Sequence, residues 1–575
     1  MKPEADHNTA ASLIVRNMSF PSDPIAAGSP RFDDADLART EQDRGALAAW
    51  RRAAMDRPAT AAAASAQGHF AAAISEGGRA LLAVDRFATQ TLCFRFDDQA
   101  LHFAQRADTL AGPVPKIDPQ ALFDYLYFHD IPSPRTIFEG VRRLPPGHCA
   151  SLENGRLVIA PYWTPRFDER PVASFSQARN EFRRLLAEAV ARQLDGSRPA
   201  AFLSGGTDSS TVAGLIGEVS GRPAATYSIG FDAKGYDEMA YARIAAQRFG
   251  CDHHEYYVTP DDLVQGIPAL AAQHDQPFGN SSALPAYICA LRAREDGVTR
   301  LLAGDGGDEL FGGNTRYAKQ RVFDWYQLVP AGLRSGLLEP LSSDGGALDR
   351  LPLLRKGASY VRQARVPMPD RLQTYNLLQR LGQTDVLTPA FLARVDLGAP
   401  ARQERAVWQQ SDGTSFVNRM LAYDWRYTLA ENDLPKVRGS TELAGVSAAY
   451  PFLDQAVVDF SVGLPTAYKL KGLKLRWFFK EALRGFLPDE IIGKKKHGFG
   501  LPFGVWAVQH ERLRALASDS LRGLGDRGIV RPEFIDALLD RYLPEHPGYY
   551  GEMVWILMML EQWFRHHAPD YRLRD

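Results

Sequence analysis

Apolar and polar positions change their spacing along the chain. Residues 22–66 show little two-residue alternation, which predicts a loop and a short Ala-rich helix near 36–55. After residue 68, short apolar runs separated by turns predict strands, and a helical pattern follows between two of them. The expected strands are 79–87, 91–96 and 155–163, and the expected helix is 119–128. This mixture is typical of an α+β region.

A different pattern begins near residue 176. Apolar residues at helical spacing over 176–194 are followed by alternating short apolar runs and amphipathic stretches. The expected strands are 199–206, 224–231, 253–259 and 298–304, and the expected helices include 208–219 and 238–249. This alternation predicts parallel βαβ units. Residues 320–430 and the tail have a mostly helical pattern. The predicted domains are therefore 1–170 and 176–575, the first α+β and the second α/β.

Composition excludes several classes of protein. The chain has 575 residues, of which 45% are hydrophobic and 23% charged, and its net charge is -1. Neither nucleic acid nor an anionic membrane is an expected partner. We find no apolar run of about 18 residues and no signal pattern in the first residues. The four cysteines are far apart without a CxxC pair, so a disulfide framework is not expected and a cytoplasmic location fits.

The stretch "SGGTDSS" follows the predicted strand that opens the second domain. A loop at a strand end that feeds a helix presents backbone N–H groups, which bind phosphate oxygens. Gly205 and Gly206 allow close backbone approach, and Ser204 and Ser209 offer hydroxyl donors. Asp208 repels phosphate but suits Mg²⁺. The loop lacks the lysine of a Walker A motif, and the structural alternative is a serine-capped turn.

A second glycine–acid loop strengthens the phosphate interpretation. "LLAGDGGDELFGGN" also leaves an apolar run and carries Asp305, Asp308 and Glu309. Two such loops at the strand ends of one sheet predict a shared polyphosphate site with a bridging metal. The alternative is an ordinary turn with solvated acids.

These motifs resemble the asparagine synthetase family, whose synthetase domain is an N-type ATP pyrophosphatase. The resemblance covers about 180–510 through "SGGTDSS", "YSIGF", "GDGGDELFGG", "YPFLD" and "KKKHGFGLPFGVW". It implies an N-terminal class II glutaminase-like sandwich, a parallel-sheet ATP-binding domain and a helical C-terminal part. It also implies that ATP adenylates a carboxylate, pyrophosphate leaves, and a nitrogen nucleophile displaces AMP.

The same resemblance implies roles for individual residues. Leu203, Ile229 and Gly304 would line the adenine and ribose site. The pyrophosphate would be held by Ser204, Gly205, Gly206, Asp208 and Ser209. Asp208 and Asp308 would bind Mg²⁺. Asp305 is a catalytic candidate, and the family's catalytic lysine aligns with Arg476, two residues after a second candidate, Lys474.

The glutaminase half departs from the family. Its nucleophile is a cysteine directly after the initiator Met, whereas this chain has Lys2 and no cysteine before Cys93. The glutamine-holding "RLSI" and "NGEIYN" stretches are also missing from 18–67. Cys93 and Cys149 are interpreted as small core residues. We therefore expect a degenerate glutaminase domain without thiol catalysis.

Other stretches depart as well. "RGSTELAGVSAAYPFLD" (438–454) has Ser447 and Ala449 where the family has Glu and Arg, and Arg438-Gly439 where it has Asp-Arg. The lost arginine weakens aspartate as a substrate. The basic stretch 493–500 either closes over phosphates or is a solvated loop. The sequence His253-His254-Glu255 lacks HExxH spacing and is expected in a strand.

The sequence lacks the glutaminase residues but keeps the ATP-binding motifs. This combination predicts that the nucleophile is an amine on the substrate, so no ammonia channel is needed. Glutaminase-dead relatives include β-lactam synthetases and lasso peptide macrolactam cyclases, so we favour macrolactam or other specialised amide formation. The expected substrate is a small-molecule or peptide carboxylate, with a precursor peptide and a maturation partner as further candidates. The alternatives are an ammonia- or glutamine-dependent asparagine synthetase, an inactive scaffold, and a tRNA-modifying pyrophosphatase.

Overall fold

A computed structural model describes residues 20, 22–97, 100–342, 352–411, 414–494 and 500–573. They form two compact units, each built from two segments of the chain. Residues 1–110 and 140–163 make the first unit, and residues 111–139 and 164–575 make the second. The sequence division at 170 and 176 stays a prediction, and the compact units do not follow it residue by residue.

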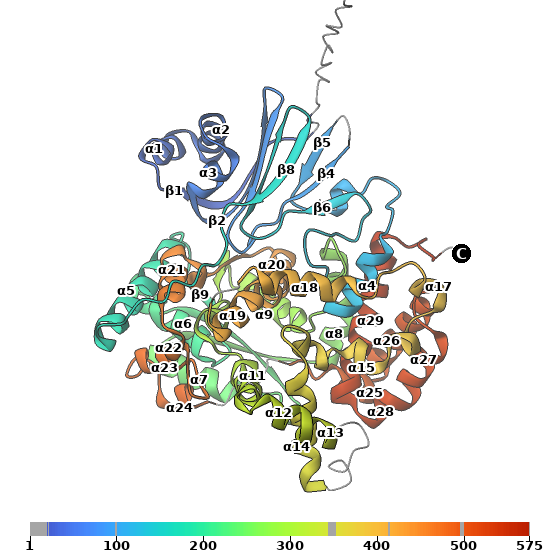
Figure 1. Cartoon of the computed structure of the whole chain (residues 1–575). Helices are drawn as coiled ribbons and strands as arrows, with labels where there is room; N and C mark the ends of the chain where they lie inside the picture. The colour runs from blue at the N-terminus through green and yellow to red at the C-terminus, as the bar shows by residue number, and fades with distance from the viewer. Residues whose placement is uncertain are drawn as a thin grey trace, which may run out of the picture. The chain divides into compact units, whose positions relative to one another are not determined.

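The first unit is a sandwich of two antiparallel sheets with helices on one outer face (Figure 1). The larger sheet, in spatial order, contains β1 (Ile25–Phe32), β2 (Ala66–Glu76), β3 (Arg79–Val84), β7 (His148–Glu153) and β8 (Arg156–Pro161). The smaller sheet contains β5 (Leu101–Ala104), β4 (Cys93–Phe96) and β6 (Val141–Arg143). The helices are α1 (Ala35–Arg44), α2 (Ala46–Asp56) and α3 (Ala59–Ala64).

Strand β2 is buried on both faces, which explains why its sequence is a continuous apolar run. Phe70 and Ile74 pack with Trp50 of α2, while Ala71 and Ala73 pack with side chains of the smaller sheet. Successive residues of a strand point to opposite faces, so two apolar faces require an unbroken run. The α+β prediction for this region is confirmed.

Strand β1 corrects the sequence interpretation of 22–66 as loop and helix. All eight residues, Ile25–Phe32, pair with β2 in antiparallel register. The sequence IAAGSPRF has small residues and a proline, which carry little intrinsic strand preference. Pairing with β2, a tertiary effect, decides the structure of this segment.

Cys93 and Cys149 are confirmed as core residues. They are 0% and 2% exposed, and burial raises the pKa of the Cys149 thiol to about 11. A thiol in that state carries almost no nucleophilic thiolate at neutral pH. Lys2, at the position where the family has its cysteine nucleophile, lies outside the described residues.

The second unit is built on a parallel sheet with the order β11–β10–β9–β12–β13. These strands are β9 (Ala200–Phe202), β10 (Ala225–Phe231), β11 (Asp252–Val258), β12 (Arg300–Leu302) and β13 (Ser447–Ala449). Along the chain this order reads 3-2-1-4-5, so the direction of winding reverses between β9 and β12. Ligands of open α/β sheets bind at the carboxyl ends of the strands at such a reversal.

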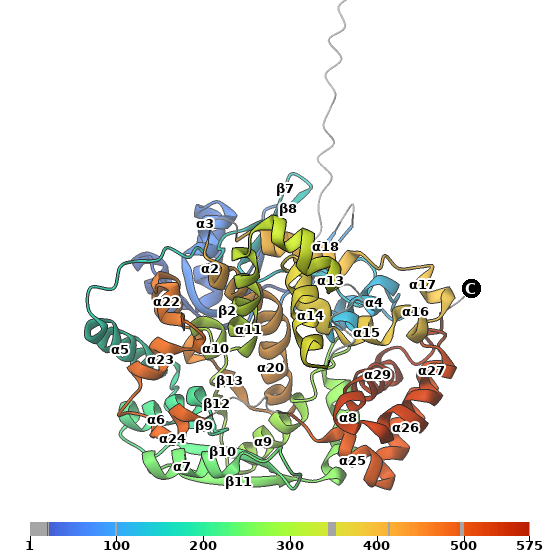
Figure 2. The same cartoon turned by 60° about the horizontal axis from the view of Figure 1, so that its bottom comes forward.

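Helices cover both faces of this sheet, with α6 and α7 on one side and α9 on the other (Figure 2). The α-helices in the first half of the unit are α4 (Pro119–Phe128), α5 (Phe175–Gln193), α6 (Thr207–Ser220), α7 (Met239–Phe249), α8 (Pro260–Gln273), α9 (Ala283–Glu295), α10 (Gly307–Phe311) and α11 (Thr315–Asp324). Then follow α12 (Ala331–Leu333), α13 (Glu339–Leu341), α14 (Pro352–Arg365), α15 (Leu377–Leu381), α16 (Gln383–Val386), α17 (Pro389–Leu392) and α18 (Ala399–Gln409).

The remaining helices include a C-terminal group in which α25, α26 and α29 pack together with α8 (Figure 2). They are α19 (Phe416–Asp424), α20 (Leu434–Leu443), α21 (Gln455–Gly463), α22 (Thr466–Lys469), α23 (Trp477–Ala482), α24 (Asp489–Gly493), α25 (Phe503–Gln509), α26 (Glu511–Gly525), α27 (Pro532–Ala537), α28 (Leu543–Glu545) and α29 (Pro547–His567). A small hairpin, β14 (Leu470–Lys471) and β15 (Lys474–Leu475), precedes α23. In the described part of the chain, none of these helices combines the length and apolarity that crossing a bilayer requires.

Buried polar contacts attach residues 111–139 to the rest of the second unit. The Tyr125 hydroxyl donates to the Ile556 carbonyl at 2.8 Å, and the Ser133 hydroxyl donates to Glu431 at 2.7 Å. Tyr127 donates to the carboxylate of Glu404, which also accepts from Tyr423 and Gln373. Glu404 is 1% exposed, and burial raises its pKa to about 7 despite these donors.

We predict that Glu404 makes stability fall as the pH rises from about 4.5 to 7. In this window the unfolded chain ionises Glu404 while the folded protein keeps it protonated, so the free energy of unfolding falls by up to about 3 kcal/mol and then levels off. Glu404→Gln should lack this component in urea unfolding at successive pH values. Glu533→Gln, at an exposed glutamate, is the control and should follow the parent protein. Identical pH curves for the parent and Glu404→Gln would contradict the assignment.

Candidate functional site

The two glycine–acid loops lie side by side at the reversal point of the sheet. The first joins β9 to α6 and carries Asp208 in its helix's first turn; the second joins β12 to α10 and carries Asp308 in the same place. Their strands pair directly, with Leu302 opposite Ala201. Both acids therefore reach the same edge of the sheet from separate loops, as a shared site requires.

Two glycines permit close packing around the first loop, one where it meets α7 and one where it meets the second loop. Gly205 has φ +67, a left-handed conformation, and an added Cβ would collide with the backbone of Tyr241 and Ala242. At Gly307 an added Cβ would overlap the carboxylate of Asp208. The first loop is also closed by its own serines, because the hydroxyls of Ser204 and Ser209 are 3.0 Å apart.

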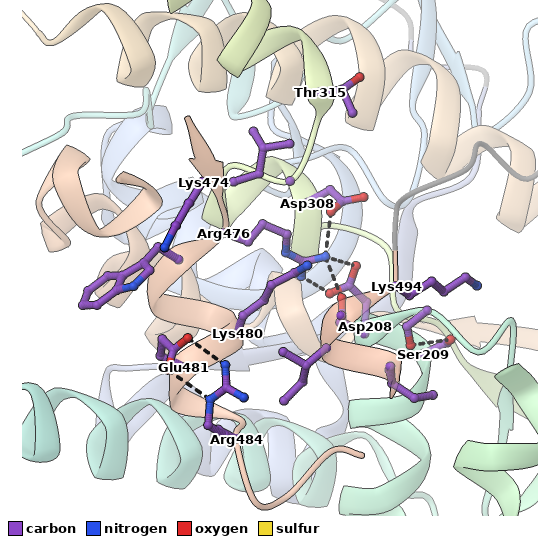
Figure 3. A pocket seen from close by; sticks show the side chains of 18 of the residues that line it. Asp208, Ser209, Asp308, Thr315, Lys474, Arg476, Lys480, Glu481, Arg484 and Lys494 are labelled. Atoms are coloured by element: carbon purple, nitrogen blue, oxygen red, sulfur yellow. Dashed lines mark hydrogen bonds and ion pairs between the residues drawn. The ribbon is translucent and has the colours of Figure 1, made fainter. Parts of the chain in front are cut away.

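Arg476 joins the two acids directly (Figure 3). Its Nη1 lies 2.9 Å from Asp208 Oδ2 and 2.7 Å from Asp308 Oδ1, and its Nη2 donates to the other oxygen of Asp208. Nη1 also donates to the Thr207 hydroxyl at 2.9 Å. Burial disfavours the charge of the guanidinium, but the two carboxylates outweigh burial and raise the pKa of Arg476.

The backbone fixes Arg476 at this position. It directly precedes α23 in a left-handed conformation, with φ +54, and the residue is 5% exposed. A residue with a Cβ costs about 1–2 kcal/mol in this conformation. Its guanidinium carbon lies 4.0 Å from the centre of the Phe479 ring. The strained backbone is held where the guanidinium reaches both loops.

A cavity of about 840 Å³ opens beside the two loops and is rich in cations. Besides Arg476, it is lined by Lys474, Lys480, Arg484 and Lys494. Burial and the neighbouring Arg476 lower the pKa of Lys480, whose amine points toward the two acids in Figure 3. Such a lining favours a polyanion such as pyrophosphate.

A second cavity, of about 430 Å³, shares Ser204, Asp208, Ser209 and Asp308 with the first. Leu203, Ile229 and Gly304, the residues assigned to adenine and ribose, all line it. Phe202 and Tyr227 add apolar surface. Three of the five phosphate candidates, Ser204, Asp208 and Ser209, therefore stand where the two cavities meet, while Gly206 lines only the larger cavity. The nucleoside candidates line the smaller cavity, and most of the cations line the larger one.

Lys436 is a site residue that the sequence analysis missed. Its amine lies 2.9 Å from Asp433 and 3.5 Å from Asp305 in the second cavity. Burial raises the pKa of Asp305, while the lysine opposes the shift. Asp433 ends a π-helical segment, Trp425–Asp433, between α19 and α20. Lys436 stands 131 residues from Asp305 in the chain, and no local motif marks it.

The other singled-out residues fall outside this centre. Lys474 is exposed, and its side chain points away from Asp208 and Asp308 in Figure 3, although it lines the larger cavity. Ser447 lies on the edge strand β13, where its hydroxyl accepts from Arg300 at 3.3 Å. His253-His254-Glu255 lies in β11, as expected for a strand.

The basic stretch 493–500 is described only in part, because residues 495–499 lie outside the described residues. Lys494 is described: its amine lies 3.1 Å from Glu238 and 3.4 Å from the Gly205 carbonyl. This residue therefore borders the phosphate loop itself.

The donors at the meeting point of the cavities suit a divalent cation. Asp208 and Asp308 aim carboxylate oxygens at one guanidinium, which shows that one cation can bridge both. Hard carboxylate oxygens are what Mg²⁺ prefers, and it commonly takes only one or two from the protein and the rest from phosphate and water. The described residues contain no group of three or more His, Cys, Asp or Glu side chains that could hold a metal, so the fit is to a site completed by phosphate.

Comparison with known proteins identifies this arrangement. Residues 181–565 match the family described as asparagine synthase, which is more than half of the chain. The chain belongs to the asparagine synthase family. Residues 52–163 match a glutamine amidotransferase domain. The expected family and fold are therefore confirmed.

Relatives in the asparagine synthase family share moderate identity with this chain. A Bacillus subtilis protein named asparagine synthetase [glutamine-hydrolyzing] 1 is 25% identical over 83% of this chain and 74% of its own length. A Mycobacterium bovis protein also named asparagine synthetase is 29% identical over 70% of this chain. This chain covers 61% of the length of that relative. A Gibberella zeae protein named amidase chry2 is 23% identical over 67% of the chain and 62% of its own length.

We predict that Gly307→Ala destabilises the protein through the contact between the loops. The new methyl group would overlap the Asp208 carboxylate, and overpacking of this kind costs about 1–3 kcal/mol. Urea unfolding measures the change. Gly332→Ala is the matched control, since its added Cβ would meet nothing within 4 Å. Equal stability of the two variants would contradict the close packing of the loops.

Proposed function

We propose that this chain is an ATP-dependent ligase that forms an amide bond through an acyl-adenylate. The observation that carries the proposal is the convergence of Asp208 and Asp308 on one cation position at the reversal point of a parallel sheet. The family supports it, since names of relatives include asparagine synthetase.

In the proposed first step, a substrate carboxylate oxygen attacks the α-phosphorus of ATP. The bond from that phosphorus to the bridging oxygen of the β-phosphate breaks, and pyrophosphate leaves with the electron pair. Asp208 and Asp308 would hold Mg²⁺, which supplies charge neutralisation for the phosphate oxygens when bound. Backbone N–H groups of the 204–206 loop, Lys480 and Lys494 stabilise the charge that grows on pyrophosphate.

In the proposed second step, an amine attacks the acyl carbon, and the bond from that carbon to the AMP oxygen breaks. The nitrogen loses one proton, and AMP leaves as the phosphate monoester. Asp305 is the candidate acceptor of this proton, because burial raises its pKa and so favours its protonated form. Lys436 holds this carboxylate in place beside the nucleoside cavity.

We further propose that the nitrogen comes from an amine on the substrate rather than from glutamine. The two cysteines of the first unit are buried, and Ser447 stands where the family's acceptor glutamate is expected. The substrate would be a small-molecule or peptide carboxylate, with macrolactam formation on a precursor peptide, aided by a maturation partner, as the favoured subtype. An asparagine synthetase that uses ammonia is the alternative subtype.

The central experiment measures pyrophosphate release from Mg·ATP with candidate carboxylates. We predict that Asp208→Ala lowers the rate by about a hundredfold or more, since it removes a metal ligand at the phosphates, while circular dichroism shows an intact fold. The control is Asp489→Ala, at an exposed ion pair with Arg484, which should keep the parent rate. Unchanged release in Asp208→Ala would refute the metal assignment, and no release by the parent protein would favour an inactive scaffold.

A separate prediction concerns the nitrogen donor. Glutamine added with ATP and the carboxylate should yield no glutamate, because a buried thiol with a raised pKa supplies no thiolate. Ammonium and primary amines are tested in parallel, with product followed by mass spectrometry. Stoichiometric glutamate would overturn the proposal of an inactive glutaminase, and product with ammonium alone would favour the asparagine synthetase alternative. A filter-binding assay with tRNA tests the alternative that the protein is a tRNA-modifying pyrophosphatase. Retention of tRNA on the filter would favour that alternative.

A further inference from the structure

The guanidinium of Arg476 occupies the gap between the two acids to which the proposed function assigns magnesium. We propose that Arg476 is a built-in cation that holds this position in the metal-free protein and competes with Mg²⁺ for it. The proposal rests on the metal assignment of the proposed function. It concerns a property that can be measured without substrate: the affinity of the free protein for magnesium.

The contacts are those of a bridging cation. Nη1 bonds to both Asp208 and Asp308, and Nη2 bonds to the second oxygen of Asp208. Other cations of the same cavity do not repeat this arrangement: Arg484 pairs with Glu481 and Asp489, and Lys494 pairs with Glu238. Arg476, which lines the cavity, forms ion pairs with both acids.

The two acids need a cation between them. Their loops are pressed together, and the side chains of Asp208 and Asp308 are only 19% and 17% exposed. Two carboxylates that are partly removed from water and face each other repel, so the folded state requires either a positive charge or a proton there. In this structure Arg476 supplies that charge.

Mg²⁺ and the guanidinium cannot occupy the position together. Magnesium binds carboxylate oxygens directly, at about 2.0–2.1 Å, so a metal between the two acids takes the space of the guanidinium, and two positive charges at that distance repel. A metal that binds both acids must therefore displace the bonds to Arg476. The displaced side chain lines the larger cavity, and guanidinium pairs well with phosphate oxygens.

This exchange ties metal loading to the presence of nucleotide. Without phosphates, displacement would leave a buried guanidinium without its anions, so magnesium alone binds poorly. With ATP, the phosphates provide new partners for both cations. The strained backbone of Arg476, with φ +54, holds the side chain in the lining of the larger cavity, next to Asp208 and Asp308.

The experiment follows thermal unfolding of the full chain while Mg²⁺ is titrated from EDTA to excess, without nucleotide. We expect the parent protein to respond weakly. Arg476→Met should have a lower melting temperature in EDTA and recover it with magnesium, at a midpoint concentration at least about tenfold below that of the parent. Arg484→Met, which removes an arginine from the same cavity without touching Asp208 or Asp308, is the matched control and should behave as the parent does. Equal magnesium midpoints for the parent and Arg476→Met would overturn the proposal.

Arg476→Lys provides a second test if Arg476→Met does not fold. A single ammonium group cannot make all the contacts that the two guanidinium nitrogens of Arg476 make, so the magnesium midpoint should fall by about threefold or more. An unchanged midpoint would overturn the proposal. Pyrophosphate release separates this outcome from the proposed function. If the variants lower the magnesium midpoint but the parent protein releases no pyrophosphate, the proposed ligase activity is refuted and the competition between Arg476 and Mg²⁺ is supported. If the parent releases pyrophosphate but the midpoints are unchanged, the ligase activity is supported and the competition is refuted.

Discussion

The architecture of the second unit depends on bringing two negative charges together at one edge of a sheet. Asp208 and Asp308 belong to loops that follow neighbouring strands, and those strands pair at Leu302 and Ala201. Like charges so placed destabilise the fold unless something offsets them. Three features make this arrangement possible: glycines permit the close approach, the first turns of two helices carry the acids, and an arginine pairs with both of them.

The same constraint explains the division of the surrounding space. The larger cavity has five cations besides apolar side chains, whereas the smaller one has Leu203, Ile229 and the Asp305–Lys436 pair. A nucleotide has the matching asymmetry, with an aromatic base at one end and a polyanion at the other. The two ends of the site therefore differ in charge, and under the proposed function a carboxylate substrate would approach where the two environments join.

The sequence revealed the loops because their signals are local. An apolar run that ends in glycines and an acid shows both the strand end and its chemistry within a dozen residues, and the family resemblance extended these to Leu203, Ile229 and Gly304. The sequence could not show which strands are neighbours, since that order comes from long-range pairing. For the same reason β1 was missed, because Ile25–Phe32 has little strand preference of its own. Lys436 was missed because its partner Asp305 is remote in the chain. The sequence also could not decide between Lys474 and Arg476, since only the folded backbone shows that Arg476 is the residue whose side chain reaches the acids.

The π-helical segment Trp425–Asp433 gives the smaller cavity a property of its own. It lies within a continuous helical rod that runs from Phe416 to Leu443. Asp433 is the last residue of the π-helical segment, and Lys436 follows in α20. Removing one residue from such a segment would turn the rest of the rod, as far as Leu443, by about 100° around its axis. Lys436 would then face another side while the sheet and both loops kept their places. Length variation at this single point thus offers a way to change what the cavity accepts without rebuilding the nucleotide site.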